Sequence, residues 1–183
     1  AINPHVWLSP QILIKEAHVI RDILIKIDPV NADEYRNNSQ NLEDTLSNLD
    51  QDFHKELSVC EKQDVIVSHD AFGYLAREYN FNTIAIAGIS PDEEPSSKTL
   101  ATLTKIALSK NIKHIFFETT VSPKLSETIA REIGGSVLVL NPLESLTQHE
   151  VQLGEDYVTV MKTNLENLQI GRASCRERVC CGV

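Results

Sequence analysis

The sequence predicts an α/β protein in which a four-stranded parallel sheet flanked by helices follows one long connecting helix. Two observations predict this class. Short apolar runs alternate with helical segments from residue 64 onward, and strands that alternate with helices form parallel sheets with right-handed crossovers. Before that point, a long helical stretch is polar around most of its circumference, which is typical of a helix that crosses solvent.

The four apolar runs are the expected strands, and each is followed by a helical segment. The strands are expected at residues 64–68, 83–87, 113–117 and 136–140, and the helices at residues 71–79, 96–109, 122–134 and 156–168. Helix-capping residues support these bounds. Ser96 and Asp156 stand at the beginning of two of the helices, and Gly134-Gly135 stands at the end of another.

Two helices are expected before the sheet. Ser9-Pro10 begins the first, and Asp28-Pro29 ends it. Its apolar face is expected to contain Leu13, Ala17, Ile20 and Leu24, which follow the 3.6-residue period. The second helix covers about residues 31–57 and carries a thin apolar stripe of Tyr35, Leu42, Leu46, Leu49, Phe53 and Leu57. We expect this polar helix to bridge two lobes.

Composition excludes several functional classes. Apolar residues make up 42% of the 183-residue chain and charged residues 23%, as in ordinary globular proteins. The net charge of −9 argues against nucleic acid as a partner, because phosphate binding needs a basic face. The sequence also contains no GxGxxG, GxxxxGK[ST], HExxH or GxSxG motif, so common nucleotide-binding and hydrolytic signatures are missing.

The last residues do not look like part of the fold. Residues 170–183 resemble the translation of a DNA adapter more than a protein sequence, and we expect them to be a non-native tail. Three of the four cysteines lie in this tail, which leaves Cys60. A disulfide framework or a CxxC metal site is therefore not expected.

Imidazole and carboxylate groups follow three of the four expected strands. His69 and Asp70 follow the first strand, Glu118 the third, and Glu144 lies shortly after the fourth. Ligands of parallel sheets bind beyond the carboxyl ends of the strands. A single polar residue at a strand end is usually a turn former or a helix cap, but several at one edge favour a metal site. Such ligands suit zinc, and also manganese or iron.

Five segments resemble signatures of the metal-binding solute-binding lipoproteins of ABC transporters, the cluster A-I family. They are residues 3–10 (NPHVWLSP), 69–75 (HDAFGYL), 89–96 (ISPDEEPS), 116–118 (FFE) and 141–144 (NPLE). Each segment is short, but all five occur in the family's order across residues 3–169. The resemblance therefore covers the chain up to the expected tail.

The resemblance implies two lobes that hold a metal ion between them. Residues 1–30 would end the amino-terminal lobe, residues 31–58 would form the connecting helix, and residues 59–169 would form the carboxy-terminal lobe. The family's metal ligands correspond to His5, His69 and Glu144. Manganese members usually carry glutamate at the position of His69 and aspartate at that of Glu144, so this chain resembles the zinc branch, with manganese as the less favoured ion.

The family also implies a function without catalysis. A zinc ion would be captured outside the cytoplasm, by a periplasmic protein or one lipid-anchored on the outer face of the cell membrane. The protein would act as a monomer and deliver zinc to an ABC permease. One family ligand, a histidine in a DPHxYEP-like segment, has no counterpart in the 183 residues. We therefore expect this chain to bind zinc weakly or not at all by itself.

Other residues are weaker candidates for a role at the metal site. Asp70 and Glu118 could orient the imidazoles from a second shell, although Asp70 could equally cap the helix expected at residue 71. Glu93 and Glu94 could form an acidic loop over the metal or be simply solvated. Trp7 and Tyr74 are expected to be hydrophobic anchors near the metal cleft. The remaining histidines are expected to be packed or exposed rather than ligating: His18, His54, His114 and His149.

Two other functions stay open at this point. Two histidines and a glutamate with an open position also describe a zinc hydrolase, for which Glu118 could be the general base. The family also includes manganese or iron binders and surface adhesins, and no residue here decides for or against an adhesive role.

Overall fold

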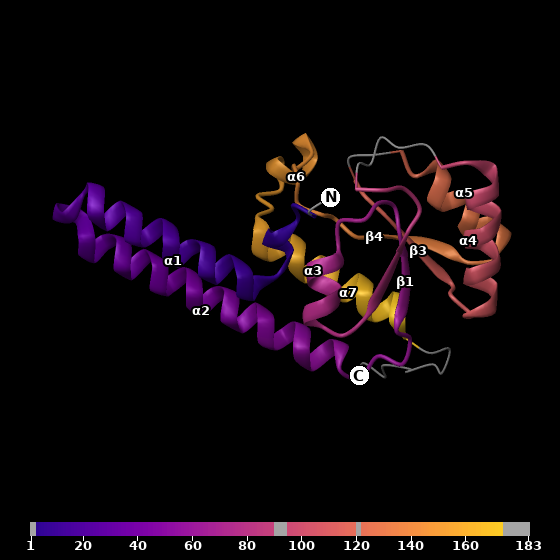
Figure 1. The fold of residues 1–183 in the computed structure, drawn as a ribbon, viewed down its shortest axis with the longest axis horizontal. Helices are drawn as coiled ribbons and strands as arrows, with labels where there is room; N and C mark the ends of the chain where they lie inside the picture. Colours follow the sequence, from indigo (N-terminus) through magenta and orange to yellow (C-terminus); the bar gives the residue numbers. More distant parts are fainter. Residues whose placement is uncertain (1–2, 90–94, 120–121, 174–183) are drawn as a thin grey trace.

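The structure, a computed structural model, describes residues 3–89, 95–119 and 122–173. It consists of an α/β lobe from which a long pair of helices projects (Figure 1). Among the helices of these residues, none combines the length and the hydropathy that a membrane span needs.

A four-stranded parallel sheet forms the centre of the α/β lobe. Its strands are β1 (Asp64–Val67), β2 (Asn82–Ala85), β3 (His114–Phe117) and β4 (Ser136–Val139). They lie in the order β2-β1-β3-β4, with Ile66 of β1 opposite Ile115 of β3 and Ile115 opposite Val137 of β4. The predicted fold class is therefore confirmed, and each strand lies within a residue or two of its expected position.

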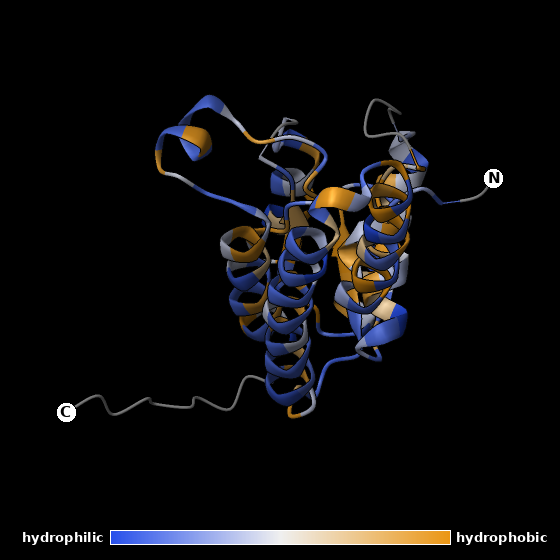
Figure 2. Cartoon of the chain, turned by 90° about the vertical axis from the view of Figure 1, so that its left-hand side faces the viewer, coloured by the Kyte–Doolittle hydropathy of each residue, from blue (hydrophilic) through white to orange (hydrophobic). Residues whose placement is uncertain are grey.

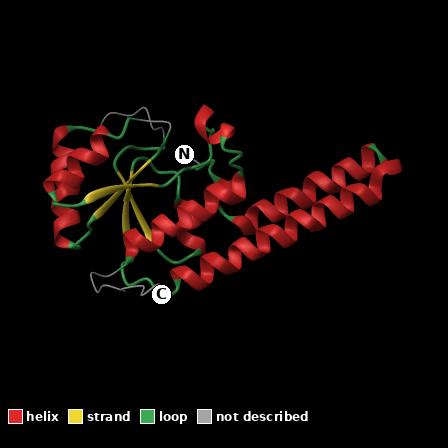
Figure 3. Ribbon diagram, turned by 180° about the vertical axis from the view of Figure 1, so that it is seen from behind, coloured by secondary structure: helices red, strands yellow, loops and turns green. Residues whose placement is uncertain are grey.

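Helices cover both faces of the sheet (Figures 1 and 3). One face packs against α3 (Gly73–Glu78), α7 (Tyr157–Arg172) and the end of α2, and the other against α4 (Ser97–Ser109) and α5 (Lys124–Glu132). Alternate strand residues point to opposite faces of the sheet. Val65 and Val67 pack in the core beside α2, α3 and α7, the first core, and Ile66 packs in the core beside α4 and α5, the second core. Because both faces are covered, β1, β3 and β4 are apolar after their first residue, whereas the edge strand β2 also carries Asn82 and Thr83.

Helix starts follow the expected capping chemistry with one exception. The side chain of Ser96 accepts a hydrogen bond from the Thr99 amide at 3.1 Å, and that of Asp156 accepts one from the Thr159 amide at 2.9 Å. Asp70 does not cap a helix, because α3 begins only at Gly73 and its N-cap residue is Phe72. That alternative for Asp70 was wrong.

The carboxy-terminal elements differ from the expectation in two ways. A short helix, α6 (Gln148–Gln152), was not predicted, and it is held by a capping box between Thr147 and Glu150. Helix α7 continues to Arg172 instead of ending near residue 168, so it extends into the first residues of the segment expected to be a tail. The rest of that segment, residues 174–183, lies outside the described residues.

The projecting part is a helical hairpin. It contains α1 (Pro10–Ile27), a 3-10 turn η2 (Pro29–Asn31) and α2 (Ala32–Leu57), and α1 and α2 pack along one another. Ser9 caps α1 as predicted, accepting a hydrogen bond from the Ile12 amide at 3.3 Å. Figure 2 looks toward the hairpin and shows hydrophobic and hydrophilic residues alternating around its helices.

Helix α1 has a second apolar stripe that faces solvent. Ile20, which we expected on the buried face, is 58% exposed, and Val19, Ile23 and Ile27 are also exposed. The expectation for Ile20 was wrong because α2 covers only one side of α1. Within the described residues, nothing covers the other side.

The two halves of helix α2 differ in burial. Its carboxy-terminal half enters the first core through Leu49, Phe53 and Leu57, which pack beside α3 and α7. Toward the hairpin tip, Leu42 is exposed and Tyr35 is half-buried, with its hydroxyl donating to Asp28 at 2.7 Å. Half of α2 is thus part of the α/β lobe, and the other half leaves it.

Replacing Phe53 with alanine is expected to lower the free energy of unfolding by about 3–5 kcal/mol. The side chain is fully buried and its ring lies 4.8 Å from that of Tyr79, so truncation leaves a cavity. Urea unfolding followed by circular dichroism measures the change. Leu42→Ala on the same helix is the control, with an expected loss below about 1 kcal/mol. Equal losses for the two variants would contradict the packing described here.

Candidate metal site

His5 belongs to a segment that lies outside the sheet but is held against it. The residue directly precedes a 3-10 turn, η1 (Val6–Leu8). The indole of Trp7 donates to the carbonyl of Pro142 at 2.8 Å, and the hydroxyl of Tyr157 donates to the carbonyl of Trp7 at 2.8 Å. These two hydrogen bonds join η1 to the loop after β4 and to α7, and they fix where His5 enters the site.

His69 and Glu144 come from the carboxyl edge of the sheet. His69 follows β1 after one residue, and Glu144 lies in the loop between β4 and α6. That loop is rigidly held, because the Asn141 amide donates to the side chain of Asn164 at 2.8 Å and the Leu143 amide donates to the side chain of Asn141 at 2.8 Å. Leu143 takes a positive φ of 57°, which turns the chain so that Glu144 can reach the site.

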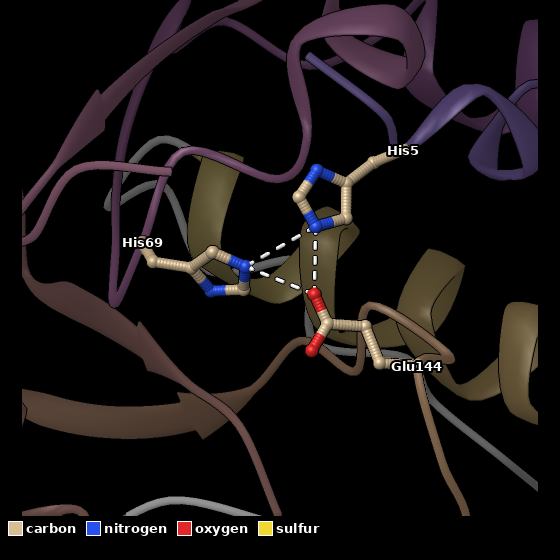
Figure 4. Close-up of side chains that lie close together, drawn as sticks. All are labelled: His5, His69 and Glu144. Carbon is tan, nitrogen blue, oxygen red and sulfur yellow. Dashed lines mark hydrogen bonds and ion pairs between the residues drawn. The ribbon is translucent and has the colours of Figure 1, made fainter. Parts of the chain in front are cut away.

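The three expected ligands meet at one point (Figure 4). Nε2 of His5 lies 2.7 Å from Oε1 of Glu144, and Nε2 of His69 lies 3.5 Å from Nε2 of His5 and 3.4 Å from the same carboxylate oxygen. Both imidazoles are buried, whereas the Glu144 side chain is 35% exposed. Residues separated by up to 139 positions thus converge.

The spacing of these atoms suits a tetrahedral zinc ion. Zinc binds nitrogen and carboxylate oxygen at about 2.0–2.2 Å, so neighbouring ligand atoms of a tetrahedron are about 3.3 Å apart. The two contacts of His69 already have this length. The contact between His5 and Glu144 is a direct hydrogen bond at 2.7 Å, and it has to lengthen by roughly half an ångström for the ion to enter.

A buried carboxylate orients the imidazole of His69. Oε1 of Glu118 accepts a hydrogen bond from Nδ1 of His69 at 2.5 Å and another from the hydroxyl of Ser68. Glu118 is fully buried, and its Oε2 has no hydrogen-bond partner among the described residues. With the Nδ1 proton directed at Glu118, the Nε2 lone pair faces the site, which is how metal-binding histidines are commonly held.

Asn3 has the corresponding role for His5. Its side-chain oxygen lies 2.7 Å from Nδ1 of His5, and its side-chain nitrogen donates to the main-chain carbonyl of Asp70 at 2.7 Å. The amide therefore joins the two histidine-bearing segments. Asn3 has no place among the orienting residues proposed from the sequence, which were Asp70 and Glu118. Of these two, Glu118 contacts His69, and the structure shows no hydrogen bond from the Asp70 side chain to an imidazole.

The carboxylates raise the pKa of His69. Burial by itself lowers the pKa of the imidazole, but the hydrogen bond to Glu118 and the negative charges of Glu118 and Glu144 outweigh it, and the pKa is raised above 6.5. An arrangement that stabilises the imidazolium also stabilises a metal cation in its place.

The other candidate histidines lie elsewhere. His18 contacts Glu43 at 2.8 Å on the hairpin, His114 lies 3.0 Å from the Ser136 hydroxyl, and His149 is exposed on α6. The acidic pair Glu93 and Glu94 lies outside the described residues. Trp7 is the expected anchor near the cleft, through its bond to Pro142, whereas Tyr74 contacts the guanidinium of Arg77 on the same helix.

This fold and site define a class: an α/β lobe that presents two imidazoles and a carboxylate to one cation at the carboxyl edge of its sheet. Comparison with known families assigns the chain within that class. Residues 1–171 match the family model described as the periplasmic zinc-uptake complex component A, ZnuA. The chain belongs to this family.

Characterised relatives support the assignment. The chain is 43% identical over 170 residues to the zinc-binding protein AdcA of Streptococcus pyogenes, covering 93% of this chain and 33% of that protein. It is also 43% identical over 169 residues to the high-affinity zinc uptake system protein ZnuA of Bacillus subtilis, covering 92% of this chain and 53% of that protein. The chain thus spans a third to a half of these relatives.

A solved structure has the same fold. The Zn(II)-bound ZnuA-like domain of Streptococcus pneumoniae AdcA superposes with a TM-score of 0.83 at 38% identity, covering 94% of this chain and 65% of that domain. The recognised family and the four-stranded parallel fold are therefore both confirmed.

Glu118→Gln is expected to weaken zinc binding by about 10–100-fold, because it removes the charge that orients and polarises His69. The dissociation constant is measured by competition with a chromophoric chelator. Asp70→Asn is the matched control, since this neighbouring carboxylate makes no recorded contact with an imidazole, and its affinity is expected to stay within about threefold. Equal effects of the two substitutions would contradict the role of Glu118.

Zinc affinity is expected to decrease as the pH is lowered, and the decrease is expected to begin above pH 6.5. The raised pKa of His69 means that its proton is bound at higher pH than in free imidazole, and zinc has to displace that proton. Below the raised pKa the loss approaches about tenfold per pH unit for each proton displaced. Competition titrations between pH 8 and pH 5.5 measure it, and an onset below pH 6 would contradict the direction of the shift.

Proposed function

We propose that this chain is the zinc-capturing part of an extracytoplasmic solute-binding protein that delivers zinc to an ABC importer. The observation that carries the proposal is the meeting of His5, His69 and Glu144 within 3.5 Å of one another. The names of the relatives, which describe zinc binding and zinc uptake, support the same function.

The geometry supports reversible capture rather than chemistry on a substrate. In the hydrogen bond between His5 and Glu144 a proton lies where the ion has to bind, so zinc enters by displacing protons. Glu144 is the ligand in contact with solvent, while the two imidazoles are buried. Entry and release therefore proceed past Glu144, whose side chain can swing without disturbing the sheet.

The donor set favours zinc over manganese. Two imidazole nitrogens suit a borderline-soft ion, whereas manganese prefers carboxylate, carbonyl and water oxygens. The residues also disfavour the hydrolase alternative. Its proposed base, Glu118, is fully buried behind His69 and hydrogen-bonded to it, so this carboxylate cannot contact a water molecule bound to the metal.

We also propose the domain division that the family implies. Residues 1–30 end a first lobe, residues 31–58 form the helix that connects the two lobes, and residues 59–169 form the second lobe. Of the non-native tail expected over residues 170–183, the first residues continue α7 as far as Arg172. The solvent-facing apolar stripe of α1 supports this division, because such a stripe is commonly covered by a partner. The first lobe would then supply the fourth ligand of the tetrahedral ion.

The three ligands are tested by substitution. His5→Ala, His69→Ala and Glu144→Gln are each expected to weaken zinc binding by at least about 100-fold, because a three-ligand site loses one of its bonds. His149→Ala, an exposed histidine near Glu144 in sequence, is the control and should bind like the parent. All proteins carry serine at Cys175, Cys180 and Cys181, so that thiols of the tail do not bind zinc.

Two outcomes would contradict the proposed function. One is tight zinc binding that survives each of the three substitutions. The other is manganese binding that matches zinc binding in a direct competition at pH 7.5. Because three ligands leave one position open, this chain is expected to bind one zinc ion at the site more weakly than a protein that supplies all four ligands.

A further inference from the structure

A second group of metal-ligating side chains lies away from the proposed site. Asp50 and His54 stand on α2, and Glu78 stands at the end of α3. Each offers a ligand atom, and these atoms all lie within 4.8 Å of one another. The group shares no residue with the site of His5, His69 and Glu144.

Asp50 carries a buried charge that lacks a strong partner. The residue is 8% exposed. Its two oxygens accept hydrogen bonds from neutral groups, the hydroxyl of Tyr79 at 2.8 Å and the side-chain amide of Gln11 at 2.8 Å. Among the described residues no lysine or arginine pairs with it, and His54 approaches only to 3.7 Å. Buried carboxylates are normally paired with a cation or bound to a metal.

His54 and Glu78 lie close to Asp50 and are more exposed to solvent than it is. His54 lies four positions after Asp50, so both side chains share one face of α2. The His54 ring contacts the Tyr79 ring edge-on at 4.9 Å, and its side chain is 54% exposed. Glu78 precedes Tyr79 on the facing helix and is half-buried. The imidazole and the two carboxylates therefore approach one another from two different helices.

We propose that Asp50, His54 and Glu78 form a second zinc site, weaker than the first, that links α2 to α3. One imidazole and two carboxylates suit zinc. The 3.7 Å separation of His54 and Asp50 is close to the roughly 3.3 Å edge of a zinc tetrahedron. Tyr79 holds the Asp50 carboxylate in place, as Glu118 holds His69. The site is weaker because Glu78 has to move closer and His54 is largely exposed.

The location gives the second ion a structural effect. Helix α3 begins four residues after His69, and α2 is the helix that leaves the α/β lobe. A zinc ion between them adds a bond to the packing of α2 against α3 within the lobe that carries the first site. Zinc in excess of one equivalent should therefore raise the melting temperature further, and this second increase should require His54.

Calorimetric zinc titration tests the proposal on the full chain with serine at Cys175, Cys180 and Cys181. The parent is expected to bind two ions, one tighter and one weaker. His54→Ala and Glu78→Gln should each weaken the second event at least tenfold and leave the first unchanged. His18→Ala is the matched control, because His18 also pairs with a helix carboxylate, Glu43, at 2.8 Å on the same hairpin.

A histidine-specific measurement keeps the test decisive if a variant folds poorly. In a His5→Ala protein, the ring resonances of His54 should shift on addition of excess zinc, while those of His18 should not. A parent that binds one ion, or a weaker event that persists in both His54→Ala and Glu78→Gln, would overturn the second site but leave the proposed function intact. A parent protein that shows the weaker binding event but not the tighter one would overturn the proposed function and leave the second site intact.

Discussion

The proposed metal site depends on how firmly the segment carrying His5 is held against the α/β lobe. His69 and Glu144 leave the same edge of one sheet, so their relative positions follow from the fold. His5 comes from outside the sheet and needs separate fixation. Trp7 and Tyr157 supply it through bonds to Pro142 and Trp7, and Asn3 supplies it through the Asp70 carbonyl. Without these contacts the two imidazoles would not share one ion.

Electrostatics then make the site suitable for a divalent cation. Two carboxylates, Glu118 and Glu144, contact the two imidazoles, so a dication with neutral histidines balances the charge. In its absence protons serve the same purpose, which is the physical origin of the raised pKa of His69. Among the described residues, Oε2 of Glu118 has no hydrogen-bond partner, so the contacts of this buried carboxylate are those of Oε1 with His69 and Ser68.

Much of this could be predicted from the sequence, for identifiable reasons. The strands and the fold class followed from apolar runs, because both faces of a parallel sheet are buried. Both Asp70 and Glu118 were candidates for orienting an imidazole, and the sequence could not show that only Glu118 does so. That outcome depends on β3 lying beside β1, and strand order is a tertiary property. Helix α6 was too short to show a period. Ile20 was misplaced because periodicity cannot reveal which apolar stripe finds a partner. Asn3 was missed because an asparagine two residues before a histidine has no distinctive pattern.

The most direct test of the central claim is a crystal structure of the chain with one equivalent of zinc, using anomalous diffraction at the zinc edge. We expect one strong peak about 2.0–2.2 Å from Nε2 of His5, Nε2 of His69 and a carboxylate oxygen of Glu144, with Glu118 still hydrogen-bonded to Nδ1 of His69. A strong peak elsewhere, with these three atoms still in direct contact, would contradict it.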